Sequence, residues 1–233
     1  MMSKKFLIVL LFLVTLIGIQ SKAQFHYCSY GEHTMRKESK SIVVHSVNMN
    51  AGLYSPKMDY WNDTYLPAFG SSVELGSNLV FGGNITFNVA SQFRTRLAVS
   101  YWSDLVEEQG VGFNELEVSF TRFSLGFFYV PYFASFGKGF QVYGGLEGFY
   151  YDINNRLEMR SAEDVVTSED HNGHDVSFAP VIGIDKVFGN HLLMGVEFSY
   201  MIGEYSQSVV VESQTNKVSI EGPQLTLLVG YRF

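Results

Sequence analysis

One short polar segment holds the densest set of side chains that could bind a metal ion. Asp170-His171-Asn172-Gly173-His174-Asp175 combines two imidazoles with carboxylates, which are ligand types that divalent cations accept. Its Asn-Gly pair is also typical of a tight turn, and we favour a turn that ends a long polar loop. Acidic side chains near it could hold Mg²⁺ or Ca²⁺, but carboxylates on a solvated loop need no such ligand. We therefore expect neither a metal site nor a bound cofactor.

Catalytic chemistry has fewer candidates. Hydrolysis of a lipid ester would need a serine, a histidine and an acid that converge at the membrane surface. His45 lies on an apolar face that carries no carboxylate, so we favour a histidine satisfied by its neighbours over a general base. The single cysteine, Cys28, excludes an internal disulfide framework and a cysteine-based zinc site. We predict no catalytic residues and no enzyme.

A further set of charged side chains shares one face of the strand-like runs and would fill the lumen of a narrow barrel. We expect a lumen charge network of six residues: Arg96, Arg122, Glu147, Asp185, Glu197 and Arg232. Buried charges must be paired, because an unpaired one is far costlier. Arg122 is predicted to face Glu147 across neighbouring strands, with Glu197 approaching Arg122 from the far wall. Asp185 is predicted to neutralise Arg96 or Arg232.

The elements that would position these side chains follow the period of two that is typical of strands. Eight runs show it: 42–54, 79–89, 94–102, 118–130, 140–151, 176–186, 191–203 and 223–233. Connections 90–93, 131–139 and 187–190 are short, whereas 55–78, 103–117, 152–175 and 204–222 are longer and polar. Short connections that alternate with long ones predict an all-β, closed antiparallel up-and-down eight-stranded transmembrane β-barrel. In the sixth run, Pro180 cannot donate to the ladder, which predicts a bulge or an irregular strand start.

The two faces of these runs indicate which medium surrounds the barrel. The apolar phase contains no Asp, Glu or Arg, and Lys186, at the end of one run, is the only lysine in all eight. The opposite phase carries the charges and many small residues, which suit a narrow interior better than a solvent face. Aromatic residues such as Tyr101, Tyr150 and Tyr200 lie near the ends of the runs on the apolar phase, where an interfacial girdle belongs. We therefore favour a membrane barrel over a soluble ligand-carrying barrel.

The first 23 residues of the 233 predict export. Lys4 and Lys5 precede a 14-residue, largely apolar stretch, Phe6 to Ile19, and Ser21-Lys22-Ala23 suits a signal peptidase. Residues 24–41 are predicted to be a polar periplasmic segment and 42–233 the barrel domain. The complete chain has a net charge of −7, and removal of three lysines would make the mature chain more acidic. This balance argues against nucleic acid as a partner.

The last nine residues carry a more specific pattern. Every second position is apolar and the chain ends on an aromatic ring: Leu225, Leu227, Val229, Tyr231 and Phe233. In this pattern the sequence resembles the small eight-stranded outer-membrane β-barrel proteins of Gram-negative bacteria. The resemblance implies that the barrel-assembly machinery recognises this strand. It also implies an outer-membrane location, contact with outer-membrane lipids and lipopolysaccharide, and periplasmic N- and C-termini.

These patterns favour an outer-membrane barrel with a side-chain-filled lumen and a structural or interaction role through acidic surface loops. A narrow pore for small solutes or ions is the first alternative. A lipid-modifying enzyme of the outer membrane is the second. The sequence does not identify the partner of the surface loops.

Overall fold

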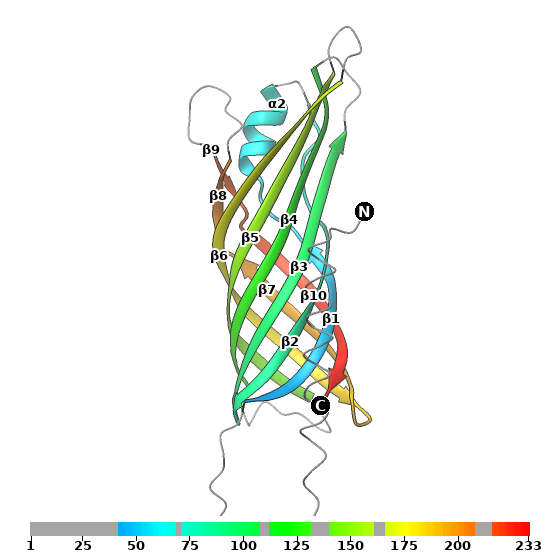
Figure 1. Cartoon of the computed structure of the whole chain (residues 1–233), viewed down its shortest axis with the longest axis vertical. Helices are drawn as coiled ribbons and strands as arrows, with labels where there is room; N and C mark the ends of the chain where they lie inside the picture. The colour runs from blue at the N-terminus through cyan, green and yellow to red at the C-terminus, as the bar shows by residue number, and fades with distance from the viewer. Residues whose placement is uncertain (1–41, 69–70, 108–111, 132–139, 161–165, 208–215) are drawn as a thin grey trace, which may run out of the picture. The chain divides into compact units, whose positions relative to one another are not determined.

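The computed structural model describes residues 42–68, 71–107, 112–131, 140–160, 166–207 and 216–233. Eight antiparallel strands form a closed barrel in the order β1-β10-β7-β6-β5-β4-β3-β2 (Figure 1). Their bounds are β1 Val43–Tyr54, β2 Asn78–Ala90, β3 Phe93–Glu107, β4 Gly112–Tyr129, β5 Phe140–Arg160, β6 Val166–Phe188, β7 Leu192–Met201 and β10 Gly222–Arg232. The signal peptide and the polar segment predicted for 1–23 and 24–41 lie outside the described residues.

Closure of the barrel depends on pairing between its first and last strands. Leu53 of β1 lies opposite both Leu225 of β10 and Leu79 of β2, so no edge remains there. Tight turns join β2 to β3 and β6 to β7 at one end of the barrel. Gly189, in the β6–β7 turn, has a φ of 59°, a left-handed conformation that glycine adopts without steric cost.

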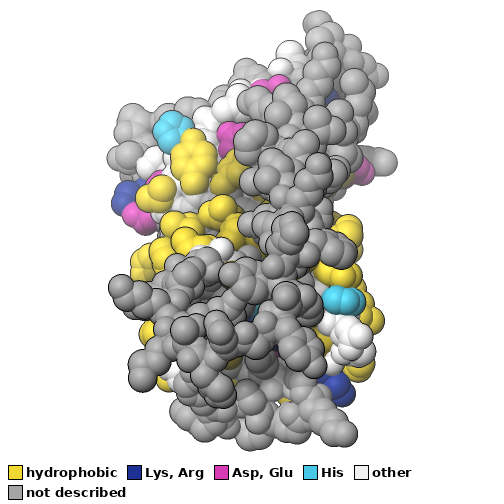
Figure 2. Space-filling view, turned by 60° about the horizontal axis from the view of Figure 1, so that its bottom comes forward, with side chains coloured by type: hydrophobic (Ala, Val, Ile, Leu, Met, Phe, Trp, Pro, Cys, Tyr) yellow, Lys and Arg dark blue, Asp and Glu magenta, His cyan; other side chains and the backbone are white. Residues whose placement is uncertain are grey.

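Large apolar side chains cover the outside of the barrel. Met49, Phe127 and Leu146 are 77%, 62% and 60% exposed, and the outward positions of the other barrel strands are similarly apolar. Where the described surface is visible in Figure 2, hydrophobic side chains predominate on the wall and acidic ones lie toward the upper end. Lipid, not water, suits such a wall. The predicted transmembrane barrel class and its outward phase are thereby confirmed.

Four strands are longer than the sequence predicted. β3 and β4 occupy most of the predicted loop 103–117, while β5 and β6 occupy most of 152–175. The turn predicted at Asn172-Gly173 is wrong, because these residues lie inside β6 opposite Asn154 and Ile153. Ten strand residues beyond Tyr150 would extend about 33 Å along β5. The central sheet therefore continues well past the apolar wall.

Polarity reverses where these strands leave the apolar wall. Below this level β5 turns apolar side chains such as Leu146 and Tyr150 outward, whereas above it Asn154 and Arg156 face outward. Ile153 and Leu157, on the inward phase, are 0% and 2% exposed. Such a reversal suits water in place of lipid outside this part of the barrel, with the apolar side chains in the interior.

Two irregularities alter the predicted pattern. The ladder between β1 and β2 shifts register between Val44 and Ser46, and both His45 and Ser46 are buried in the interior. The placement of His45 on the outward face is therefore wrong. Pro180 causes no register shift against β5, but continuous pairing of β6 with β7 begins only after it, at Val181. The irregularity expected at Pro180 thus affects the pairing of β6 with β7 and not its pairing with β5.

The segment between β1 and β2 folds over one end of the barrel (Figure 1). It contains the π-helical turn η1 (Tyr60–Tyr65) and the short helix α2 (Leu66–Ala68). A two-stranded hairpin, β8 (Glu204–Gln207) and β9 (Asn216–Ser219), lies between β7 and β10 in the chain. No helix in the described part of the chain is long and apolar enough to cross a membrane.

Candidate functional site

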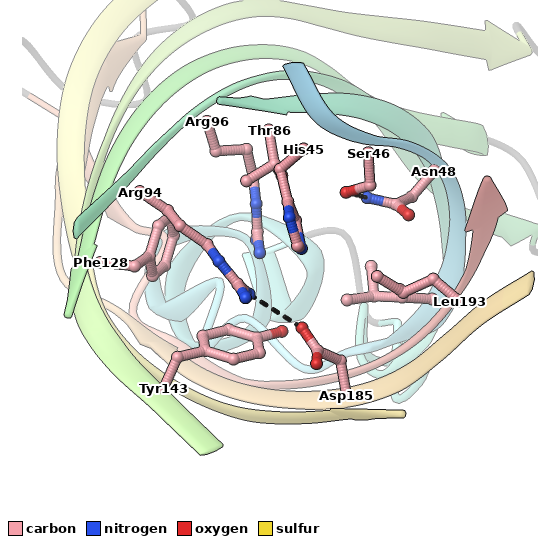
Figure 3. A pocket seen from close by; sticks show the side chains of 11 residues that line it. His45, Ser46, Asn48, Thr86, Arg94, Arg96, Phe128, Tyr143, Asp185 and Leu193 are labelled. Atoms are coloured by element: carbon pink, nitrogen blue, oxygen red, sulfur yellow. Dashed lines mark hydrogen bonds and ion pairs between the residues drawn. The ribbon is translucent and has the colours of Figure 1, made fainter. Parts of the chain in front are cut away.

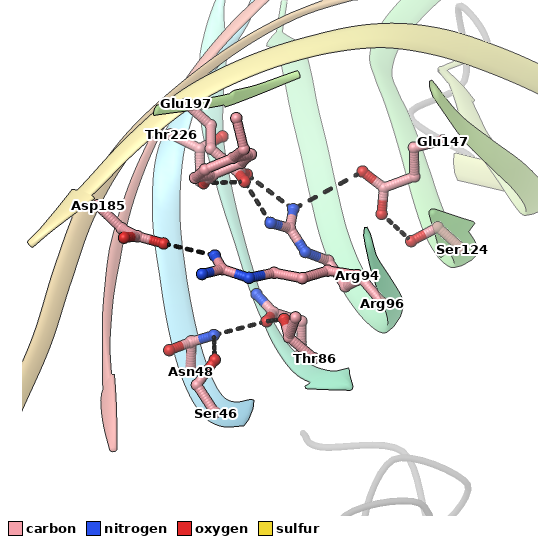
Figure 4. A network of polar contacts seen from close by, with 12 residues as sticks. Ser46, Asn48, Thr86, Arg94, Arg96, Ser124, Glu147, Asp185, Glu197 and Thr226 are labelled. Atoms are coloured by element: carbon pink, nitrogen blue, oxygen red, sulfur yellow. Dashed lines mark hydrogen bonds and ion pairs between the residues drawn. The ribbon is translucent and has the colours of Figure 1, made fainter. Parts of the chain in front are cut away.

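A network of charged side chains crosses the lower lumen (Figure 4). Arg94 of β3 donates from Nη1 to Oδ2 of Asp185 on β6 at 3.0 Å. Its other terminal nitrogen donates to the side-chain oxygen of Gln141 on β5. Both charged side chains are more than nine-tenths buried. This contact crosses the lumen, since β4 and β5 separate β3 from β6 in the barrel.

Arg96 makes the second set of contacts across the lumen. Its guanidinium donates two hydrogen bonds to the carboxylate of Glu197 on β7, one of them at 2.9 Å. Nη1 also lies 4.0 Å from Oε2 of Glu147 on β5, and the guanidinium carbon lies 4.4 Å from the ring centre of Phe128. A bidentate arginine–carboxylate pair is directional as well as strong. Arg96 thereby ties three strands together across the bore.

Neutral side chains complete the coordination of these carboxylates. The Tyr143 hydroxyl donates to Oε1 of Glu197 at 2.5 Å, and Ser124 Oγ donates to Oε1 of Glu147 at 2.6 Å. Buried ions are tolerated only where additional hydrogen bonds satisfy them. The two carboxylates are consequently held in fixed positions inside the wall.

The predicted pairings within this network are wrong. Arg122 does not face Glu147, because it lies opposite Tyr151, whereas Glu147 lies opposite Gly126. Arg122 instead donates to Ser100 Oγ at 3.0 Å and to Gln224 Oε1 at 2.9 Å, and Glu197 binds Arg96. Strands of a barrel are tilted and staggered, so heights counted along single strands do not identify neighbours across the bore.

Asp185 and Arg232 also differ from the prediction. Asp185 binds Arg94, which the predicted network omitted, and not Arg96 or Arg232. Arg232 is half-buried at the end of β10 and has no ion pair within 4.0 Å among the described residues. The alternation of the third run already placed Arg94 on the same face as Arg96, and this signal could have included it.

A small chamber lies beside the network, and Arg94, Arg96 and His45 line it (Figure 3). Its cavity volume is about 10 Å³, which is about the space that one water molecule needs. His45 Nε2, Arg96 Nε and Asp185 Oδ1 find no hydrogen-bond partner among the described residues. The chamber therefore admits nothing larger than water.

An apolar core fills the barrel above Arg122 and is here called the cap core. It joins η1, the upper strands and the β8–β9 hairpin, and its buried residues include Tyr54, Met58, Trp61, Tyr65, Leu66, Trp102, Leu116, Phe120, Tyr151, Ile153, Tyr205 and Ile220. The rings of Trp102 and Phe120 stack with their centres 4.9 Å apart, and Phe120 meets Tyr205 edge-on at 6.0 Å. Burial of each large apolar side chain stabilises by about 1.5–3 kcal/mol. This end of the barrel is closed by a packed core.

Several polar groups inside the cap core are hydrogen-bonded, but Trp102 Nε1 has no hydrogen-bond partner among the described residues. Trp61 Nε1 donates to the Tyr205 hydroxyl at 2.9 Å, and that hydroxyl in turn donates to Asn155 Oδ1 at 3.4 Å. Burial raises the pKa of Tyr205 above its ordinary value, which disfavours the ionised hydroxyl. Asn62 stabilises the path of the segment between β1 and β2. Its side chain forms two 2.8 Å hydrogen bonds with the backbone of Leu75, one as donor and one as acceptor.

The remaining predicted residues lie away from both sites. All five apolar residues of the proposed assembly signal point outward, with Tyr231 stacked on His191 at 4.7 Å between ring centres. The segment Asp170 to Asp175 lies inside β6. Among the described residues, no group of three or more metal-binding side chains is brought together.

Comparison with known proteins supports the architecture. No protein-family model and no curated protein matches the chain. Among solved structures, the outer membrane protein OprG of Pseudomonas aeruginosa matches with a TM-score of 0.55 and 18% identity, covering 83% of this chain and 98% of that one. Neisserial surface protein A matches with a TM-score of 0.49 and 8% identity, covering 82% of this chain and 97% of that one. Ail of Yersinia pestis matches with a TM-score of 0.47 and 12% identity, covering 82% of this chain and 98% of that one. The similarity to OprG shows that the chain has the fold of a small eight-stranded outer-membrane β-barrel.

Proposed function

We propose that this chain is a non-enzymatic outer-membrane protein of a Gram-negative bacterium whose sealed barrel carries a rigid platform outside the membrane. The observation that carries the proposal is the double closure of the bore. The arginine–carboxylate network blocks the lower lumen, and the cap core fills its other end. A barrel closed twice is suited to presenting a surface and not to passing solutes.

The two ends of the barrel support one orientation in the membrane. Tight turns are typical of the periplasmic end of such barrels, and longer segments of the outer end. The turns at 91–92 and 189–191 therefore lie in the periplasm, together with both ends of the barrel domain. The cap core and the upper parts of β3 to β6 then stand on the cell surface.

An interaction role is favoured by the construction of this outer part. The extended strands expose polar side chains such as Asn154 and Arg156 outward, while their inner faces pack into the cap core. A flexible loop would need no apolar core of this size. The core holds the outer surface in one shape, which lowers the entropy lost when a partner binds.

The pore alternative would require an open path. Arg96 and its two carboxylates, followed by Arg122 and the cap core, obstruct the axis. The test is single-channel recording of the purified full chain in planar bilayers. We expect no steady open level, and steady large conductance would contradict the sealed barrel.

Membrane insertion is tested separately by electrophoresis of purified outer membranes. A closed ladder keeps its backbone hydrogen bonds inside and resists detergent until it is heated. Boiled and unboiled samples should therefore migrate at different apparent masses. Recovery in the soluble periplasmic fraction without this shift would support the soluble carrier instead.

A further inference from the structure

One lysine stands on the lipid-facing wall near the tight turns. Lys186 lies on β6 in the outward phase of Ile184, opposite Phe140 on β5 and Met194 on β7. Its Nζ lies 4.3 Å from the ring centre of Phe140 and 4.7 Å from that of Phe188. Two aromatic rings thus hold the ammonium group in place.

Among the residues that the structure describes, Lys186 has no anionic partner. No carboxylate of the described residues lies within 4.0 Å of its Nζ. Its neighbour Asp185 points into the lumen and binds Arg94. Lys186 is also the only lysine in the eight barrel strands. An unpaired cation on an otherwise apolar wall indicates an anion supplied from outside the protein.

An apolar groove begins at the same place. Its cavity volume is about 320 Å³, which falls within the range of about 300–1,000 Å³ for small-molecule sites. Its lining includes the side chains of Phe140, Ile184, Phe188, Met194, Val196 and Leu227. These residues belong to β5, β6, β7 and β10 or to their ends. A hydrocarbon chain is the ligand that such a surface matches.

The height of Lys186 agrees with a lipid head group. β6 ends at Phe188, just before the tight turn, so the ammonium lies close to the periplasmic end of the apolar wall. Lysine side chains at such positions extend toward the interface, where the cost of a charge is small. The phosphates of the inner leaflet lie in the same zone.

We propose that Lys186 and this groove form a binding site for one anionic phospholipid of the inner leaflet. The lipid phosphate binds the ammonium between the two rings, and one acyl chain occupies the groove. This inference rests on the membrane orientation proposed above. It adds a specific lipid contact that a sealed barrel does not by itself require.

The test is native mass spectrometry of the full chain folded in detergent micelles and titrated with dioleoylphosphatidylglycerol. We expect one retained lipid for the unaltered chain. Lys186→Gln should weaken retention about fivefold, because a lysine near an anionic lipid surface contributes about 1 kcal/mol. Val196→Trp, which fills the groove, should also weaken it. Lys217→Gln is the matched control, since Lys217 lies on β9 and binds Glu204.

A second titration uses dioleoylglycerol, which has the same acyl chains without phosphate. Lys186→Gln should leave its retention unchanged. Equal phosphatidylglycerol retention by the unaltered chain and Lys186→Gln would overturn the site, as would an equal loss in Lys217→Gln. The heat-dependent shift in migration is measured on the same samples. If the shift is present but the lipid effect is not, the lipid site fails while the barrel proposal stands.

Discussion

Removal of Arg96 is the sharpest perturbation of the sealed lumen. Arg96→Ala leaves Glu197 and Glu147 without their shared cation, and both carboxylates are nine-tenths or more buried. Loss of one partner from a buried ion pair costs about 3–5 kcal/mol. The contact with Phe128 is lost as well. We therefore predict that the free energy of unfolding falls by at least about 3 kcal/mol.

The assay is urea unfolding of the barrel in lipid vesicles, followed by tryptophan emission and by migration of unheated samples. Arg156→Ala is the control, because Arg156 is 47% exposed and binds Glu158 at the surface. Exposed pairs contribute about 0–1 kcal/mol. A loss no larger for Arg96→Ala than for Arg156→Ala would refute the buried network.

A double variant separates charge from packing. Glu197→Gln removes one of the two carboxylates that Arg96→Ala leaves unpaired, so the combined variant should be less destabilised than the sum of the two single variants. The coupling free energy should exceed about 1 kcal/mol, which is the order expected for groups in one network. Strict additivity would show that Arg96 stabilises the barrel through its volume alone.

Three further predictions address assembly, the outer core and pH. Deletion of Phe233 or Phe233→Asp should reduce inserted barrel and leave protein in the periplasm, as measured by fractionation; normal insertion would contradict the assembly signal, since a charge at the interface costs only about 0–1 kcal/mol. Trp61→Ala should destabilise the cap core by about 3–5 kcal/mol and expose it to proteases without loss of the heat-dependent shift; a cap that resists proteolysis as before would argue against this packing. Burial and the nearby carboxylates Glu158 and Glu107 raise the pKa of Glu115 above its ordinary value of 4.5. The folded state then binds this proton more readily than the unfolded state, so stability rises as pH falls from 7 through the raised pKa. Glu115→Gln should remove this part of the pH dependence in urea titrations, and an unchanged profile would contradict it.

The barrel could be predicted from the sequence because its strands alternate strictly between two media. Leu225, Leu227 and Val229 repeat at every second position, and the structure turns all three outward. One extra residue in a bulge is enough to break such a rule. His45 was assigned to the wrong face for this reason, since a register shift follows Val44.

The upper parts of β3 to β6 were not predicted as strands because their pattern has the opposite polarity. Leu116 and Val118 alternate with Glu115 and Glu117, but here the apolar residues face inward. If strands are recognised only by apolar residues on the outward face, they end where that face becomes polar, and the rest is assigned to a loop. The signal for these longer strands was an alternation of apolar and polar residues that continues beyond the boundary, with the apolar residues on the opposite face.

Pairing inside the lumen could not be read from single strands. Arg96 and Glu197 come from strands far apart in the sequence, and their meeting depends on the tilt and stagger of the whole barrel. Residue types predicted that charges would share the interior. Only the closed geometry assigns Arg94 to Asp185 and leaves Arg122 with neutral partners.

The cap core joins the first outer segment of the chain to the last. Lys57 and Met58 donate backbone hydrogen bonds to Glu221 and Ser219 at 2.9 and 3.0 Å, across the seam where β1 meets β10. Contacts between such distant parts of a chain form late, because a long loop must close first. We therefore expect the contact between Trp61 and Tyr205 to form late in folding, when the two ends of the barrel meet, and the emission of Trp61 in a Trp102→Phe variant would report this step.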